Sequence, residues 1–153
     1  MTLASVVPPA LILKAILVRG GAFKATYQFS TEGLKERYFF VINRRPDADD
    51  KVVLLTASTQ EEKRRQCHGA RADVILVTVE PAEYSELRQR SVIDCESLIK
   101  RPRKDFEAQA LARAYKPLPV LPESVIGRIV CAIAASRTLS TAEKRLILEP
   151  DAL

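Results

Sequence analysis

The sequence predicts an α+β fold, in which a small SH3-like antiparallel β barrel carries one inserted short helix and helices appended at its C-terminal end. As far as residue 98, short apolar and β-branched runs alternate with polar, glycine or proline turn signals. Beyond it, alanine-rich and amphipathic segments favour helices. We expect a single domain over residues 1–153, with a β-rich body over about 10–98 and a basic linker and helical part over about 99–153.

The first predicted elements precede the strongest strand. Residues 10–18 are apolar and fit either a buried strand or a short helix, because periodicity does not decide over so short a run. A glycine pair at 20–21 signals a turn. Residues 25–29 suit a strand, and a turn is expected over 30–33. The aromatic and β-branched residues 38–43 are the most strand-like in the chain.

A polar loop and a second strong strand come next. Residues 44–50 contain a proline and three aspartates, which favours a loop. Residues 51–57 are apolar at successive positions, as in a strand buried on both faces. Ser58 and Glu61 have the spacing of a capping box, so we expect a helix that starts there and stops near Gly69.

The remaining segments predict two further strands and then helices. Residues 73–79 and 91–95 are strand-like, with a turn or short helix over 81–87 between them. Residues 100–104 read as a basic linker, and 105–115 have helical propensity.

The C-terminal segments have clearer signals. Three prolines make residues 116–122 extended or turning. Residues 123–136 form an amphipathic helix with apolar side chains at i, i+1, i+4, i+5 and i+8. Ser140 and Glu143 satisfy a second capping box, which predicts a last short helix.

The composition excludes several classes of protein. Hydrophobic residues make up 47% and charged residues 28% of the chain, which is ordinary for a soluble globular protein. Five glycines and an aromatic content of 6% exclude collagen-like and low-complexity chains. There are 24 basic and 19 acidic side chains, and the net charge of +5 permits a polyanionic partner without requiring one.

The cysteines and the N-terminal segment predict a cytoplasmic location. Cys67, Cys95 and Cys131 are odd in number and widely spaced, which is typical of reduced thiols in a cytosolic protein. The apolar run near the N-terminus is interrupted by two prolines and by Lys14. It is too short to span a bilayer and makes a poor signal peptide, so we expect no membrane partner.

The stretch 37–59 carries the functional signal. Arg37 stands at the mouth of the first strong strand, and Ser58 and Thr59 close the second one. This arrangement resembles the MazF/PemK-like toxins of type II toxin–antitoxin systems, which often have an arginine-proline pair, an apolar strand, a loop and an apolar strand ending in Thr-Ser. Here Tyr38 stands at the proline position.

The resemblance covers residues 10–98 and 120–148. The apolar helix followed by LSTAEKRLI is similar to the family's last helices. The Gly-Asp opening of the family's first strand is replaced by the residues VRGG at 18–21, and the segment 99–121 has no family counterpart.

The resemblance implies a metal-independent endoribonuclease, without a cofactor, that cleaves single-stranded RNA. The RNA 2′-hydroxyl attacks its own 3′ phosphate and leaves a cyclic phosphate, which requires a cation and hydrogen-bond donors around the reacting phosphorus. Arg37 would supply fork-like donors, and Ser58 or Thr59 a hydroxyl. A helix starting at Ser58 would add backbone N–H groups. Family membership also implies a homodimer and a cognate antitoxin protein.

Four further basic residues are expected to contact the RNA backbone. Arg44 and Arg45 lie in the predicted loop, and Lys63 and Arg64 in the predicted helix. No aromatic residues are interleaved with the basic runs, so base stacking is not supported there.

Simpler interpretations stay open. Arg37 also fits a solvated charge at a strand end, and Ser58 also fits a helix cap alone. The alternative function is a noncatalytic small-barrel module that binds a protein or a nucleic acid. A third option is an enzyme that uses Cys95 or His68. No second histidine exists to complete a zinc set, so we expect no metal site.

Overall fold

The computed structural model describes residues 7–29 and 33–152, with the side chains of 27–29 and 152 left aside. Seven described strands form one antiparallel sheet in the order β4-β5-β3-β2-β1-β7, and β6 pairs with β3 as well. The strands are β1 Ala22–Phe29, β2 Gly33–Val41, β3 Lys51–Ser58, β4 Leu76–Val79, β5 Ser91–Asp94, β6 Ile99–Pro102 and β7 Lys116–Leu118. The helices are α2 Pro9–Ile16, α3 Glu61–His68, α4 Ala72–Ile75, α5 Arg103–Leu111, α6 Glu123–Ala135 and α7 Thr141–Arg145, with 3-10 turns η1 Gly69–Arg71 and η2 Pro150–Ala152.

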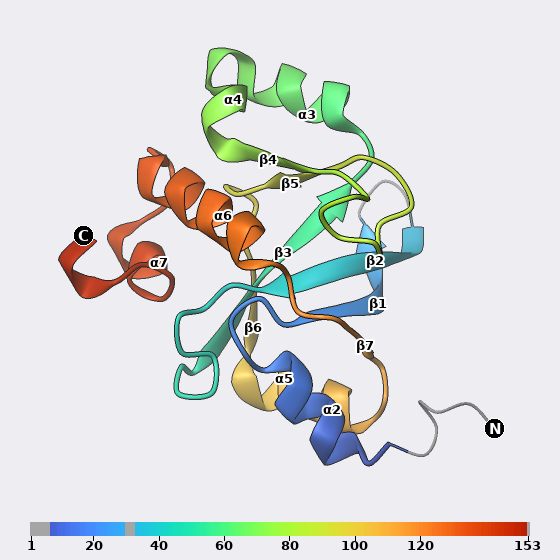
Figure 1. Cartoon of the computed structure of the whole chain (residues 1–153). Helices are drawn as coiled ribbons and strands as arrows, with labels where there is room; N and C mark the ends of the chain where they lie inside the picture. The colour runs from blue at the N-terminus through green and yellow to red at the C-terminus, as the bar shows by residue number, and fades with distance from the viewer. Residues whose placement is uncertain (1–6, 30–32, 153) are drawn as a thin grey trace.

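Helices cover both faces of the sheet. Along β3, Val53 and Leu55 join a core cluster that contains the apolar face of α6. Val52 and Leu54, which alternate with them, join a second cluster with Phe106 of α5. Figure 1 shows α6 and α7 on one side of the strands and α2 and α5 on another. The unbroken apolar run of β3 follows from this double burial.

Strand β3 changes partners along its length. Residues 51–54 pair with β6 on one edge and residues 54–56 with β2 on the other, so Leu54 is the partner of both Val41 and Ile99. Its last residues pair with β5, through Ala57 and Ile93. The α+β class is therefore confirmed. In the described residues the sheet is not closed on itself, so the predicted SH3-like barrel is not confirmed.

Several predicted elements are confirmed. Residues 25–29, 38–41 and 51–57 lie in strands β1, β2 and β3, and 91–94 form β5. Residues 10–18, for which the sequence allowed either a strand or a short helix, lie mostly in helix α2, which buries Ile12 and Ile16.

The last predicted helices are confirmed as well. Helix α6 has the expected apolar face, with Val125, Ile129 and Ile133 buried. Helix α7 starts with the predicted capping box, in which Ser140 and Glu143 satisfy each other's backbone N–H groups. The predicted turn at 30–33 falls mainly outside the described residues.

Three predicted elements were wrong. The capping box at Ser58 does not form, because β3 continues through this residue and helix α3 begins only at Glu61, with Gln60 as its N-cap. The strand predicted over 73–79 begins as helix α4 and becomes extended only at Leu76.

The third wrong prediction is the basic linker at 100–104. Its first residues form β6, an edge strand whose burial alternates along its length. Arg103 then opens helix α5, and its backbone N–H donates to the Asp50 carbonyl. Basic residues are common on edge strands, where their side chains stay in solvent.

Candidate functional site

Arg37 and Ser58 lie just beyond the last paired residues of two neighbouring strands. The β2–β3 pairing ends with Phe39 opposite Thr56, and Arg37 and Ser58 each lie two residues beyond that pair, where Ser58 pairs with Val92 of β5. Residues two apart on a strand face the same side of the sheet, so Arg37 shares the side of Phe39 and Ser58 that of Leu54 and Thr56. That side is the α5 face, because Phe39 and Leu54 belong to the core cluster there. Both side chains are partly exposed.

The hydroxyl group of Ser58 is still able to donate a hydrogen bond. Its oxygen accepts a hydrogen bond from the Gln60 backbone N–H at 3.1 Å, which uses a lone pair and leaves the O–H able to donate. Thr59 follows the strand and is exposed.

The N-terminus of α3 does not favour an anion, contrary to the sequence prediction. Its first turn carries Glu61 and Glu62. Side-chain hydrogen bonds from Arg90 and Arg65 hold the pKa of Glu61 at about 2, so this carboxylate is charged at neutral pH. Arg65 and Arg90 neutralise the charge of Glu61, but the exposed carboxylate of Glu62 weakens the attraction that backbone N–H groups have for a phosphate.

The two loop arginines follow the C-terminal end of β2, whereas Arg37 lies in the middle of this strand, which begins at Gly33, and not at its mouth as the sequence predicted. The backbone N–H of Arg44 donates to the Leu146 carbonyl at 2.8 Å, and its guanidinium lies 3.5 Å from the Glu149 carboxylate. Arg44 therefore joins the loop to the C-terminal segment. Arg45 is exposed on the same loop. The structure does not bring either residue to Arg37.

The two basic residues of helix α3 that were expected to contact RNA, Lys63 and Arg64, have different surroundings. Lys63 is exposed on α3. Arg64 lies 3.9 Å from an Asp94 carboxylate oxygen, at the junction of α3 with β5. Since α3 begins three residues after Ser58, both side chains lie on the element that follows the proposed hydroxyl.

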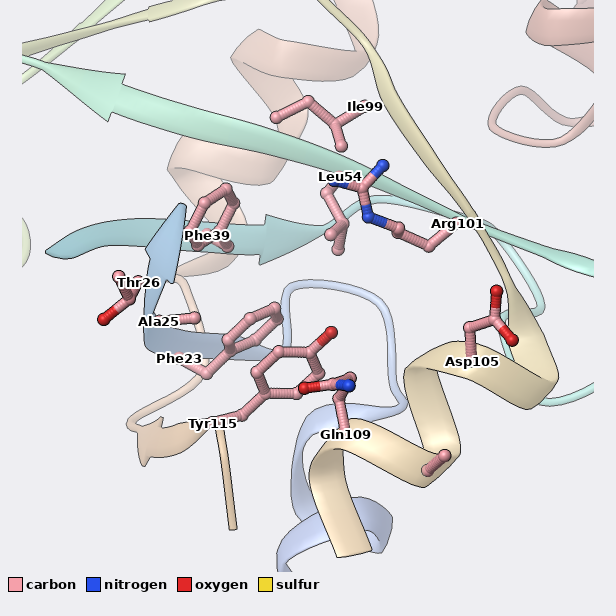
Figure 2. Close-up of a pocket in the computed structure, with 11 residues that line it drawn as sticks. Phe23, Ala25, Thr26, Phe39, Leu54, Ile99, Arg101, Asp105, Gln109 and Tyr115 are labelled. Atoms are coloured by element: carbon pink, nitrogen blue, oxygen red, sulfur yellow. The ribbon is translucent and has the colours of Figure 1, made fainter. Parts of the chain in front are cut away.

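A pocket of about 400 Å³ opens on the same face of the sheet as Arg37. Its wall includes Ala25, which is the cross-strand partner of Arg37. Figure 2 shows Arg101 on β6 and Asp105 and Gln109 on α5 around a wall of aromatic rings. The rings are those of Phe23, Phe39 and Tyr115.

The aromatic wall is tightly packed. The ring centroid of Tyr115 lies 4.2 Å from that of Phe23 and 5.1 Å from that of Phe106. Burial raises the pKa of the Tyr115 hydroxyl, Arg101 lowers it, and Asp105 raises it further. The charges of Arg101 and Asp105 thus act on the hydroxyl that faces the pocket.

The sequence interpretation missed this pocket. It treated residues 100–104 as a linker, so Arg101 was not assigned to a strand beside a core. Two signals were present in the sequence. Asp105 and Gln109 are four residues apart and share one face of a predicted helix. Phe106 and Tyr115 are large aromatic residues inside an alanine-rich segment.

His68 lies in a separate polar cluster. Its Nε2 is 2.7 Å from an Asp94 carboxylate oxygen, and its Nδ1 is 3.9 Å from Glu96. Arg71 lies 3.2 Å from Glu96, and the Ser136 hydroxyl donates to the same carboxylate. Burial alone would raise the pKa of Glu96, but hydrogen bonds from Ser136, Thr138 and Arg71 together lower it. These contacts join α3, β5 and the end of α6.

The cysteines give little support to a thiol mechanism. Cys95 is fully buried, and burial together with Asp94 and Glu96 raises the pKa of its thiol well above the ordinary value. Such a thiol stays protonated and is a poor nucleophile. In the described part of the chain, no three His, Cys, Asp or Glu side chains are grouped so that they could hold a metal ion.

No protein-family model matches this chain, and no curated protein sequence matches it either. Among the helices of residues 7–29 and 33–152, none has the length and apolar character needed to cross a membrane. The functional conclusion therefore depends on the geometry of the site.

Proposed function

We propose that this protein is a MazF/PemK-like toxin, an endoribonuclease that cleaves single-stranded RNA on the α5 face of its sheet. The observation that carries the proposal is strand alternation, which puts Arg37 on the face of β2 that Phe39 occupies and Ser58 on the face of β3 that Leu54 occupies, each two residues beyond the last β2–β3 pair. A planar cation and a hydroxyl donor on one face suit the recognition of a phosphodiester. The same proposal includes a homodimer, a cognate antitoxin protein, a cytoplasmic location and a diverged SH3-like barrel.

The chemistry is an internal transesterification. The 2′-oxygen of the RNA attacks the adjacent phosphorus, the new P–O2′ bond forms and the P–O5′ bond breaks. The 2′-hydroxyl loses its proton and the departing 5′-oxygen gains one. Arg37 donates N–H groups to the phosphate oxygens, and Ser58 donates its hydroxyl hydrogen as negative charge builds up there. The products carry a 2′,3′-cyclic phosphate and a 5′-hydroxyl.

The test is cleavage of single-stranded RNA in the presence of EDTA. Wild-type protein is expected to release cyclic-phosphate ends and to arrest growth when expressed alone. Arg37→Ala is expected to lose about a hundredfold or more in rate, as on removal of one preorganised donor. Arg137→Ala is the matched control, because Arg137 is an exposed arginine just after α6. Equal rates for Arg37→Ala and wild type would remove Arg37 from the site.

The second candidate is a noncatalytic module that binds RNA. The observation in its favour is the pair of carboxylates in the first turn of α3, three and four residues after Ser58. Arg65 and Arg90 neutralise the charge of Glu61, so the exposed carboxylate of Glu62 is the one that opposes the accumulation of negative charge that cleavage requires. This candidate predicts RNA binding without turnover, and no growth arrest on expression of the chain alone.

A further inference from the structure

The pocket beside Arg37 has no role in the transesterification itself. Its volume of about 400 Å³ lies inside the range of ligand pockets, about 300–1,000 Å³. A nucleobase is smaller than a drug-sized ligand, so it fits. The segment that builds one side, β6 with α5 and Tyr115, is the part of the chain without a counterpart in the family that the sequence resembles.

One wall of the pocket is suited to a flat ring. The Tyr115 side chain is partly exposed, while Phe23 behind it is buried and 4.2 Å away between ring centroids. Phe23 is itself stacked on Phe39 at 5.5 Å. Tyr115 is therefore held in place by packing. Aromatic side chains on which a base stacks are a common means of binding single-stranded RNA.

The opposite wall offers a specific set of polar groups. Asp105 and Gln109 are both exposed, stand four residues apart on α5 and both line the pocket, with Asp105 on the side of Arg101 and Gln109 on the side of Tyr115 (Figure 2). An ionised carboxylate only accepts hydrogen bonds, and its two oxygens can accept from two adjacent donors. The Gln109 amide can donate to an acceptor beside them.

We propose that this pocket binds a guanine base of the RNA, with Asp105 accepting from the guanine N1–H and N2–H groups and Gln109 donating to O6. The ring stacks on Tyr115. The proposal rests on the proposed function, since it names the base that the same RNA-binding face selects. Ala25 lies in the pocket wall directly opposite Arg37 on β2, so a base in the pocket has its sugar-phosphate backbone beside the proposed cleavage site.

The Asp105 carboxylate is expected to discriminate among the four bases. Guanine has two neighbouring donors, N1–H and the 2-amino group. Adenine and cytosine have one amino group beside a ring nitrogen that accepts, which repels the second carboxylate oxygen. Uracil has a single N–H between two carbonyl oxygens. A good bidentate contact is worth about tenfold or more in discrimination against the wrong base.

The test is calorimetric titration of the full chain with GMP, IMP, AMP, CMP and UMP. GMP is expected to bind about tenfold or more tightly than AMP, CMP or UMP. IMP, which lacks only the 2-amino group, is expected to lie between them. Asp105→Asn should abolish the preference for GMP. Glu107→Gln removes a charge from the same helix, where Glu107 pairs with Arg103, and should leave the preference unchanged.

Equal affinities for GMP and AMP, no binding of any nucleotide, or a GMP preference that survives Asp105→Asn would overturn the guanine assignment. Failure of this inference is distinguishable from failure of the proposed function. RNA cleavage that depends on Arg37, without GMP binding, would remove the guanine pocket and keep the nuclease. GMP binding with the expected base preference, without RNA cleavage, would support the pocket and count against the nuclease.

Discussion

The hydroxyl of Thr56 donates a hydrogen bond of 2.8 Å to the backbone carbonyl of Tyr38. The bond forms where β3 leaves β2, since Thr56 still pairs with Phe39 while the next residue, Ala57, pairs with Ile93 of β5. A side chain thus satisfies a carbonyl at the point where the two strands part. This contact fixes the direction of β3 just before it reaches Ser58.

We predict that Thr56→Val lowers both stability and activity. Valine keeps the shape and the strand propensity of threonine but removes the donor, which should cost about 1 kcal/mol in the free energy of unfolding. Because Ser58 lies two residues further on, RNA cleavage should fall as well. Urea unfolding and the cleavage rate check this prediction.

The matched control for that substitution is Thr78→Val on β4. Thr78 is also a partly exposed strand threonine, and its hydrogen bond with Arg128 uses its backbone carbonyl and not its hydroxyl. Its replacement should change the free energy of unfolding by less than about 0.5 kcal/mol. If the two variants were equally stable and equally active, the Thr56 hydroxyl would have no special role.

Asn43 is predicted to be essential to the loop that joins β2 and β3. Its buried side chain accepts from the Val53 N–H at 2.6 Å and donates to the Lys51 carbonyl at 2.8 Å and to the Asp49 carboxylate at 2.9 Å. Asn43→Ala leaves at least one buried backbone group without a partner, which should cost about 3 kcal/mol. The urea midpoint of unfolding measures this loss.

The exposed residue Asp47 in the same loop provides the comparison for Asn43. Asp47→Ala should keep the wild-type unfolding midpoint, because the contact made by Asp47 uses its backbone carbonyl, which accepts from Arg103. A midpoint for Asn43→Ala as high as that of Asp47→Ala would show that the side chain does not hold the loop.

Much of the fold was predictable because its signals are local. The unbroken apolar run of β3, the apolar face of α6 and the Ser140 capping box each depend on nearby residues. What the sequence pattern could not show depends on distant partners. Lys100 and Arg101 look like a linker until Val53 and Val52 pair with them. The pocket at Tyr115 was missed for the same reason.

The run of residues 73–79 shows a second limit. Its apolar and β-branched side chains fit a buried strand as well as a short helix. In the structure Ile75 ends helix α4 and Leu76 begins β4. Packing of α4 against α3 and α6 sets the point at which the chain changes from helix to strand.

We predict that Glu61 makes the stability of the folded protein depend on pH. Hydrogen bonds from Arg90 and Arg65 lower its pKa to about 2 in the folded protein, from an ordinary value of 4.5. A depressed pKa in the folded state contributes stability above the unfolded value, and this is lost as the pH falls from 4.5 to about 2. The ion pairs are partly exposed to solvent, so the effect should be below about 1 kcal/mol.

Urea unfolding between pH 6 and 2 tests the Glu61 prediction. Glu61→Gln should be less stable than wild type at pH 6, and the difference should shrink as the pH falls. Glu62→Gln removes the neighbouring carboxylate, which is exposed, and should keep the wild-type pH profile. A difference between Glu61→Gln and wild type that stayed constant down to pH 2 would contradict the assignment of these ion pairs.

The central claim is that Arg37 and Ser58 act on one phosphodiester, and a double-mutant cycle on RNA cleavage tests it most directly. The rates of wild type, Arg37→Ala, Ser58→Ala and the double variant are measured in EDTA on one single-stranded RNA. We predict that each single variant loses most of the activity and that the double variant loses far less than the product of the two effects. Full activity in Arg37→Ala and in Ser58→Ala, or two losses that multiply independently, would contradict a shared site.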